Sequence, residues 1–95
     1  MKFKVTNDKG FNIPTLMRHL GYHPFRDSYS RRLGAGHYPK FHIYVDDHGL
    51  ELMINLHLDQ KKVSYQNQVA HSGDYEDNER LDEEKERIIT LLEAI

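Results

Sequence analysis

The sequence predicts an α+β fold, a two-layer sandwich in which two helices cover one face of a three-stranded antiparallel sheet. Aliphatic and polar residues alternate strictly over residues 50–59, as in a strand with one buried face. Apolar residues at helical spacing precede and follow the strand-forming region. Elements that each have a single apolar face pack in layers around one core. The predicted order is therefore helix–β–β–β–helix in a single domain of 95 residues.

The strand at residues 50–59 has an aliphatic face and a mostly polar face. The aliphatic face consists of Leu50, Leu52, Ile54, Leu56 and Leu58, and the other face consists of Glu51, Met53, Asn55, His57 and Asp59.

A second strand is predicted at residues 40–47, with His42 and Tyr44 on its polar face. Asp47-His48-Gly49 has the composition of a hairpin turn. A two-residue turn would place His42 opposite Asn55, and a four-residue loop would shift the pairing by two residues. Either loop leaves His42 and His57 on the same face. Residues 28–33 are predicted as the remaining strand, with Arg31 on one face and Arg32 on the other.

The first helix is predicted to begin after Asn12, a good N-cap residue, with Pro14 in its first turn and Gly21 as its end signal. The last helix is predicted from residue 77 or 78 to residue 95. Its acidic residues are expected to form a solvated face near the N-terminal end, where the helix dipole favours negative charge. The apolar stripes of the two helices are Ile13, Leu16, Met17 and Leu20, and Leu81, Ile88, Leu91, Leu92 and Ile95.

Three segments have weaker signals. Residues 1–10 are compatible with an edge strand or with a disordered start, because Phe3 and Val5 alternate with lysines. Residues 22–27 are predicted as a connector, because Pro24 interrupts them. Residues 60–77 show no periodicity and are predicted as a long loop that either covers the polar face of the sheet or leaves it open.

Composition limits the class of protein. The chain has no cysteine, which excludes disulfides and thiolate zinc sites. It has no apolar run of membrane-spanning length and no apolar N-terminal signal segment, so we expect a cytoplasmic protein without membrane contact. Residues 1–45 carry eight Lys or Arg and two Asp or Glu (+6), whereas residues 46–95 carry five and thirteen (−8). Such a division favours either binding of an anion or pairing between the two halves.

The polar face of the predicted sheet is the first candidate site. His42, His57 and Asp59 are the candidate ligands of a divalent metal, because two imidazoles and a carboxylate can hold such an ion with open positions. The same groups could supply a general base and its orienting partner. The alternative is a polar surface that only keeps the sheet soluble. No other cofactor is predicted.

A basic and aromatic group of residues is the second candidate site. Arginine binds phosphate through two hydrogen bonds, and aromatic rings stack on bases. Pairing with the acidic half of the chain is the alternative, and the calculated isoelectric point of 6.4 argues against general affinity for nucleic acid. The candidate nucleic-acid-binding residues are Arg31, Arg32, Lys40 and Tyr44.

A family resemblance points the same way. Five segments follow one another in the chain: a short helix ending in Gly21-Tyr22, an arginine-containing strand, the Gly36-His37 turn, an aromatic strand, and an aliphatic strand closing on His57. In the order of these segments the chain resembles the HicA-like mRNA-interferase toxins, which have a double-stranded-RNA-binding-domain-like fold. The resemblance implies a catalytic role in RNA cleavage for His37. Gly36 stands where that family has a serine, and the last helix begins with acidic residues where double-stranded-RNA-binding domains have lysines.

The functional expectation is a small RNA-binding or RNA-cleaving domain that uses the polar sheet face and the loop at residues 34–40. If the protein cleaves RNA, His37 or His57 would act as the general base or acid. One alternative is a protein-interaction or inhibitor module, such as an antitoxin or a phage-type blocker, without catalysis. The other is a protein with a divalent-metal site on the sheet face.

Overall fold

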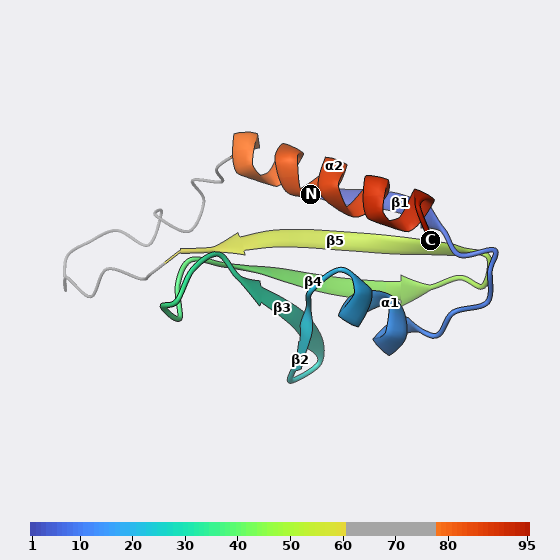
Figure 1. Cartoon of the computed structure of the whole chain (residues 1–95), viewed down its shortest axis with the longest axis horizontal. Helices are drawn as coiled ribbons and strands as arrows, with labels where there is room; N and C mark the ends of the chain where they lie inside the picture. The colour runs from blue at the N-terminus through green and yellow to red at the C-terminus, as the bar shows by residue number, and fades with distance from the viewer. Residues whose placement is uncertain (61–77) are drawn as a thin grey trace.

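The computed structural model describes residues 1–60 and 78–95, which form one antiparallel sheet and two helices (Figure 1). The predicted loop at residues 60–77 lies outside the described residues, except for Gln60. The elements in chain order are β1 (Lys2–Thr6), α1 (Ile13–His19), β2 (His23–Phe25), β3 (Ser28–Arg32), β4 (Lys40–Asp47), β5 (Glu51–Asp59) and α2 (Asn78–Glu93).

Within residues 1–60 and 78–95 the sheet has five strands in the order β1-β5-β4-β3-β2, so the predicted three-stranded sheet and the helix–β–β–β–helix order were wrong. The central strands β3, β4 and β5 lie in the regions where strands were predicted. The two additional strands are the edges of the sheet, and both are short.

Each edge strand has a physical reason for being difficult to predict. In β1, Phe3 and Val5 bury their side chains opposite Ile54 and Leu52 of β5, a contact that joins segments about fifty residues apart. In β2, Pro24 was interpreted as a strand breaker. Proline is tolerated in an edge strand, where its missing N–H can be on the side without a neighbour.

The β4–β5 hairpin follows the four-residue-loop alternative. Val45 pairs with Ile54, and His42 pairs directly with His57. Within the loop, the amide of Gly49 donates a 2.9 Å hydrogen bond to Oδ1 of Asp47, and Gly49 has a φ of 84°, which glycine adopts without strain. His42 and His57 therefore share one face of the sheet as neighbours.

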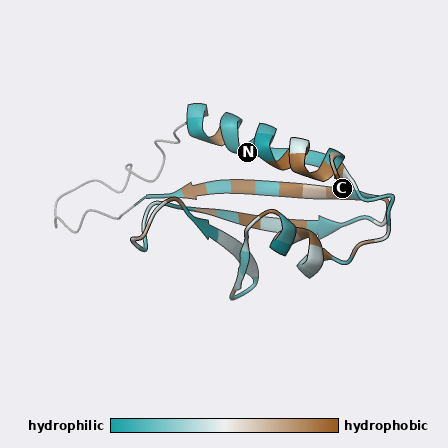
Figure 2. Cartoon of the chain, in the orientation of Figure 1, coloured by the Kyte–Doolittle hydropathy of each residue, from teal (hydrophilic) through white to brown (hydrophobic). Residues whose placement is uncertain are grey.

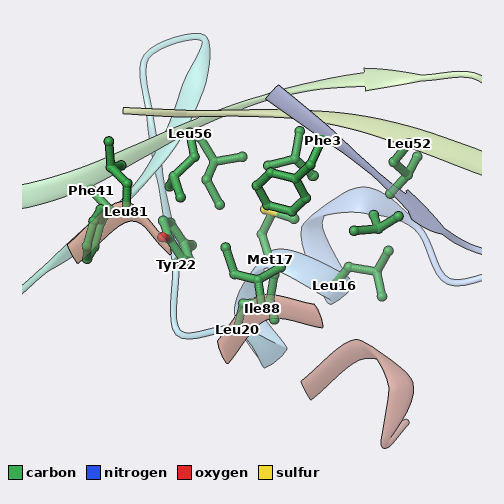
Figure 3. Packing of buried hydrophobic residues seen from close by; sticks show 13 residues of the cluster. Phe3, Leu16, Met17, Leu20, Tyr22, Phe41, Leu52, Leu56, Leu81 and Ile88 are labelled. Atoms are coloured by element: carbon green, nitrogen blue, oxygen red, sulfur yellow. The ribbon is translucent and has the colours of Figure 1, made fainter. Parts of the chain in front are cut away.

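Both helices cover the other face. In Figure 2 the bands along β5 alternate between hydrophobic and hydrophilic, and the hydrophobic positions face the core. Figure 3 shows side chains from the strands and from both helices converging in this core. The buried apolar residues are Phe3, Val5, Leu16, Met17, Leu20, Tyr22, Phe41, Ile43, Leu52, Ile54, Leu56, Leu81 and Ile88.

Helix α1 is fixed at both ends by local chemistry. Oδ1 of Asn12 accepts a 2.9 Å hydrogen bond from the amide of Thr15, which satisfies one of the free N–H groups of the first turn. At the other end Gly21 takes a φ of 87°. This turn delivers Tyr22 into the core, where the residue is only 1 % exposed.

Candidate functional site

The face of the sheet opposite the helices, here called the open face, carries most of the predicted site residues. The strand registers place on it the side chains that alternate with the core residues. Those side chains are Lys2, Lys4 and Thr6 of β1, Glu51, Met53, Asn55, His57 and Asp59 of β5, Lys40, His42, Tyr44 and Asp46 of β4, Ser28, Ser30 and Arg32 of β3, and His23 and Phe25 of β2.

Lys40 is an unusual residue of this face because it is only 3 % exposed. Its Nζ lies 4.4 Å from the centre of the Phe25 ring and 5.1 Å from that of Tyr38, so two aromatic faces surround the ammonium group. Its hydrogen-bond partner is Nε2 of His37, at 3.0 Å. Among the described residues, no carboxylate forms an ion pair with Lys40.

The contact with Lys40 selects the tautomer of the His37 ring. An ammonium group can only donate, so Nε2 of His37 must accept and the ring proton lies on Nδ1. The His37 ring also meets Tyr38 edge-on, with 4.6 Å between the ring centres. In this arrangement Nε2 cannot serve as a general base until Lys40 releases it.

His42 and Asp59 form a pair next to Lys40. The carboxylate of Asp59 contacts Nδ1 of His42, and the Phe25 ring stacks on the imidazole with 5.5 Å between the ring centres. Nε2 of His42 is buried and has no hydrogen-bond partner. Burial lowers the pKa of His42 and the charge of Lys40 lowers it further, whereas the charge of Asp59 raises it. Burial and Lys40 therefore favour the neutral form of His42.

His57 and Tyr44 lie beside this pair. The Tyr44 ring is 42 % exposed and meets the half-buried His57 ring edge-on, with 5.9 Å between the centres. The structure thus brings His37, His42, His57, Lys40 and Asp59 into one neighbourhood. Among residues 1–60 and 78–95, however, no three His, Cys, Asp or Glu side chains are placed to hold a metal ion.

Arg31 is a predicted site residue whose side chain does not lie on the open face. Its register position opposite Phe41 puts it on the helix-covered face, where Nη2 lies 2.9 Å from Oε1 of Glu84. Arg32 projects to the open face and is exposed. Of the two arginines predicted to bind phosphate, only Arg32 is available on the open face.

A buried group of charged residues around Glu84 was missed by the sequence analysis. Glu84, predicted to lie on a solvated face, is 3 % exposed. Its carboxylate accepts hydrogen bonds from the Tyr22 hydroxyl at 2.6 Å, from Nη2 of Arg31 at 2.9 Å, and from Nε and Nη2 of Arg87, each at 2.8 Å. Nη2 of Arg87 also donates to the Leu20 carbonyl oxygen at 2.7 Å. These bonds join α2 to β3 and to the segment that follows α1, so internal pairing of the basic and acidic halves of the chain is realised here.

The same contacts shift two pKa values. Burial opposes ionisation of Glu84, but hydrogen bonds from Arg87, Arg31 and Tyr22 outweigh it and hold the pKa of Glu84 at about 2. Burial, and then the negative charge of Glu84, raise the pKa of the Tyr22 hydroxyl far above its usual value. At neutral pH, Glu84 is therefore ionised and Tyr22 is a permanent donor.

We expect acid to weaken the fold through Glu84. Its carboxyl titrates near 4.5 in the unfolded chain and at about 2 in the folded protein. The resulting stabilisation, about 3 kcal/mol, is present above pH 4.5 and is lost as the pH falls towards 2. The carbon chemical shift of the Glu84 carboxyl, followed during an acid titration alongside urea unfolding, measures both effects. A titration midpoint near 4.5 would contradict the prediction.

Comparisons with known proteins found no relative of this chain. No protein-family model, curated protein or solved structure matches this chain. Within the described residues, neither helix is both long enough and apolar enough to cross a membrane.

Proposed function

We propose that the protein binds single-stranded RNA on its open face. The observation that carries the proposal is Lys40, a buried ammonium group on that face without a carboxylate partner among the described residues. Asp59 lies opposite Lys40 in the register, yet its carboxylate contacts His42 instead. A buried cation without a counter-ion favours an anionic ligand. An RNA phosphate reaching Nζ in place of the His37 ring would supply that charge.

Aromatic rings near Lys40 favour unpaired bases as the other part of the ligand. Tyr38 and Tyr44 are 41 % and 42 % exposed, and His57 meets Tyr44 edge-on. Bases that are not held in a duplex can stack on such rings, each contributing about 1–3 kcal/mol. Arg32, exposed on the same face, would hold a neighbouring phosphate.

Binding can be tested by fluorescence anisotropy with a labelled single-stranded RNA of about 12 nucleotides, a length in the range that one small domain covers. We expect the double variant Arg32→Ala/Tyr44→Ala to bind at least about tenfold more weakly, because it loses one phosphate contact and one stacking ring. Affinity should also fall as salt rises from about 50 to about 200 mM.

The matched control is Arg18→Ala, which removes one positive charge from an exposed position of α1, away from the open face. It should bind RNA like the wild type. Absence of binding at low salt, or equal affinity of the double variant and the control, would refute the proposal.

Gel analysis of the same RNA tests the separate prediction that His37 or His57 supports cleavage. In that case the wild type should cleave the RNA, whereas His37→Ala or His57→Ala should leave it intact without abolishing binding.

A further inference from the structure

Strand β1 is an edge of the sheet, and among the described residues no strand pairs with its outer side. The amide of Leu56 donates to the Met1 carbonyl oxygen and the amide of Asn7 donates to the Leu50 carbonyl oxygen, each at 2.7 Å. Backbone groups alternate in direction along an antiparallel strand, so the odd-numbered residues of β1 face β5. The N–H and C=O groups of Lys2, Lys4 and Thr6 therefore point away from the sheet.

A groove runs beside this edge, between β1 and the C-terminal half of α2, which lie close together in Figure 1. It has a volume of about 450 Å³. Val5, Ile89 and Leu92 give it an apolar part, while Lys4, Thr6 and Lys9 line it together with Asp8 and Glu93. The groove could receive small apolar side chains from a strand placed next to β1.

Positive charge is concentrated at the same edge. Lys2 and Lys4 are exposed on the open face, and their cross-strand neighbours Asn55 and Met53 are uncharged. Within the described parts of the chain, neither lysine forms an ion pair. On the helix side of β1, Nζ of Lys85 lies 5.5 Å from the centre of the Phe3 ring. A ligand at this edge would meet lysines on both faces of the sheet.

We propose that β1 binds an extended acidic peptide segment as a sixth, antiparallel strand of the sheet. Residues directly opposite Lys2 and Lys4 would be acidic, and the residues between them would be small and apolar and would enter the groove. Backbone hydrogen bonds supply affinity and the alternating side chains supply specificity in this kind of recognition. All four strand pairs of the sheet are antiparallel, which sets the expected direction.

Two other arrangements fit the edge strands less well. Pairing of β1 with β1 of a second copy would bring the lysines of the two chains together, and like charges on neighbouring strands are destabilising. The opposite edge, β2, has three residues and contains Pro24, so it offers a shorter strand with one amide fewer.

The probe is a labelled, end-blocked peptide of about six residues, close to the usual length of a strand, in which glutamate and valine alternate. We expect it to bind, and the variant Lys2→Glu/Lys4→Glu to weaken binding at least about tenfold. The control variant Arg18→Glu/Arg32→Glu carries the same change in net charge and should bind the peptide normally. Because Arg32 belongs to the proposed RNA site and not to this edge, failure of one proposal is distinguishable from failure of the other.

Two methylated peptides test the backbone hydrogen bonds. In an antiparallel pair, residues directly opposite Lys2 and Lys4 turn their own N–H groups towards β1. Methylation of the glutamate nitrogens should therefore abolish binding, whereas methylation of the valine nitrogens should not. Bound peptide should also protect the amides of Lys2, Lys4 and Thr6 from hydrogen exchange. Lack of binding, or binding that survives methylation of the glutamates, would overturn the proposal.

Discussion

Replacing Glu84 by glutamine is expected to lower the free energy of unfolding by about 4 kcal/mol, because removal of one member of a buried ion pair leaves its partners without compensation. The carboxylate is bound by Arg31, Arg87 and Tyr22. Glutamine has nearly the same shape but no charge, and its amide N–H₂ group would face donors. Urea unfolding at pH 7, followed by circular dichroism, measures the change.

The matched control is Glu83→Gln, the same substitution at the preceding, exposed position of α2. Its effect should stay within about 0.5 kcal/mol, as for most surface substitutions. If the two variants differ by less than about 1 kcal/mol, the Glu84 hydrogen bonds do not stabilise the fold as argued here. Failure of Glu84→Gln to fold while Glu83→Gln folds normally would agree with the prediction.

Truncation of Ile54 to alanine is expected to cost a similar amount, about 4 kcal/mol. Ile54 is fully buried at the middle of the sheet, where β5 pairs with Phe3 of β1 on one side and with Val45 of β4 on the other. Strands on both sides restrict collapse around the lost atoms, so a cavity would remain. The midpoint of urea unfolding should fall accordingly.

Leu50→Ala provides a control with the same chemistry, because leucine and isoleucine lose the same number of atoms on truncation. Leu50 is 68 % exposed in the β4–β5 loop, and we expect its truncation to cost less than about 0.5 kcal/mol. A comparable loss of stability in both variants would show that Ile54 is not at the centre of the core.

Periodicity explains which parts of the fold could be predicted. The alternation in β5 and the apolar stripe of α1 are local patterns that depend only on which face is buried. The partner of β1 cannot be obtained in this way, because Phe3 and Val5 acquire a buried face only by pairing with β5. For β2, the mistaken step was to treat Pro24 as a general strand breaker without considering an edge position.

The candidate site was predictable to the extent that it depends on alternation within a strand. Alternation put His42 and His57 on one face, and the register makes them direct neighbours. The same rule places Arg31 on the face of Tyr29, away from Arg32, so grouping both arginines by charge ignored an available signal. The contact of Glu84 with Tyr22 joins residues 62 positions apart, and no local pattern indicates it.

The strand order has a consequence for the growing chain. During synthesis β1 is made before β5, its neighbour in the sheet among the described residues, which follows almost fifty residues later. Closing a segment of that length costs more conformational entropy than forming the adjacent β4–β5 hairpin. Until β5 has been synthesised, Phe3 and Val5 lack the strand with which they pair in the folded protein.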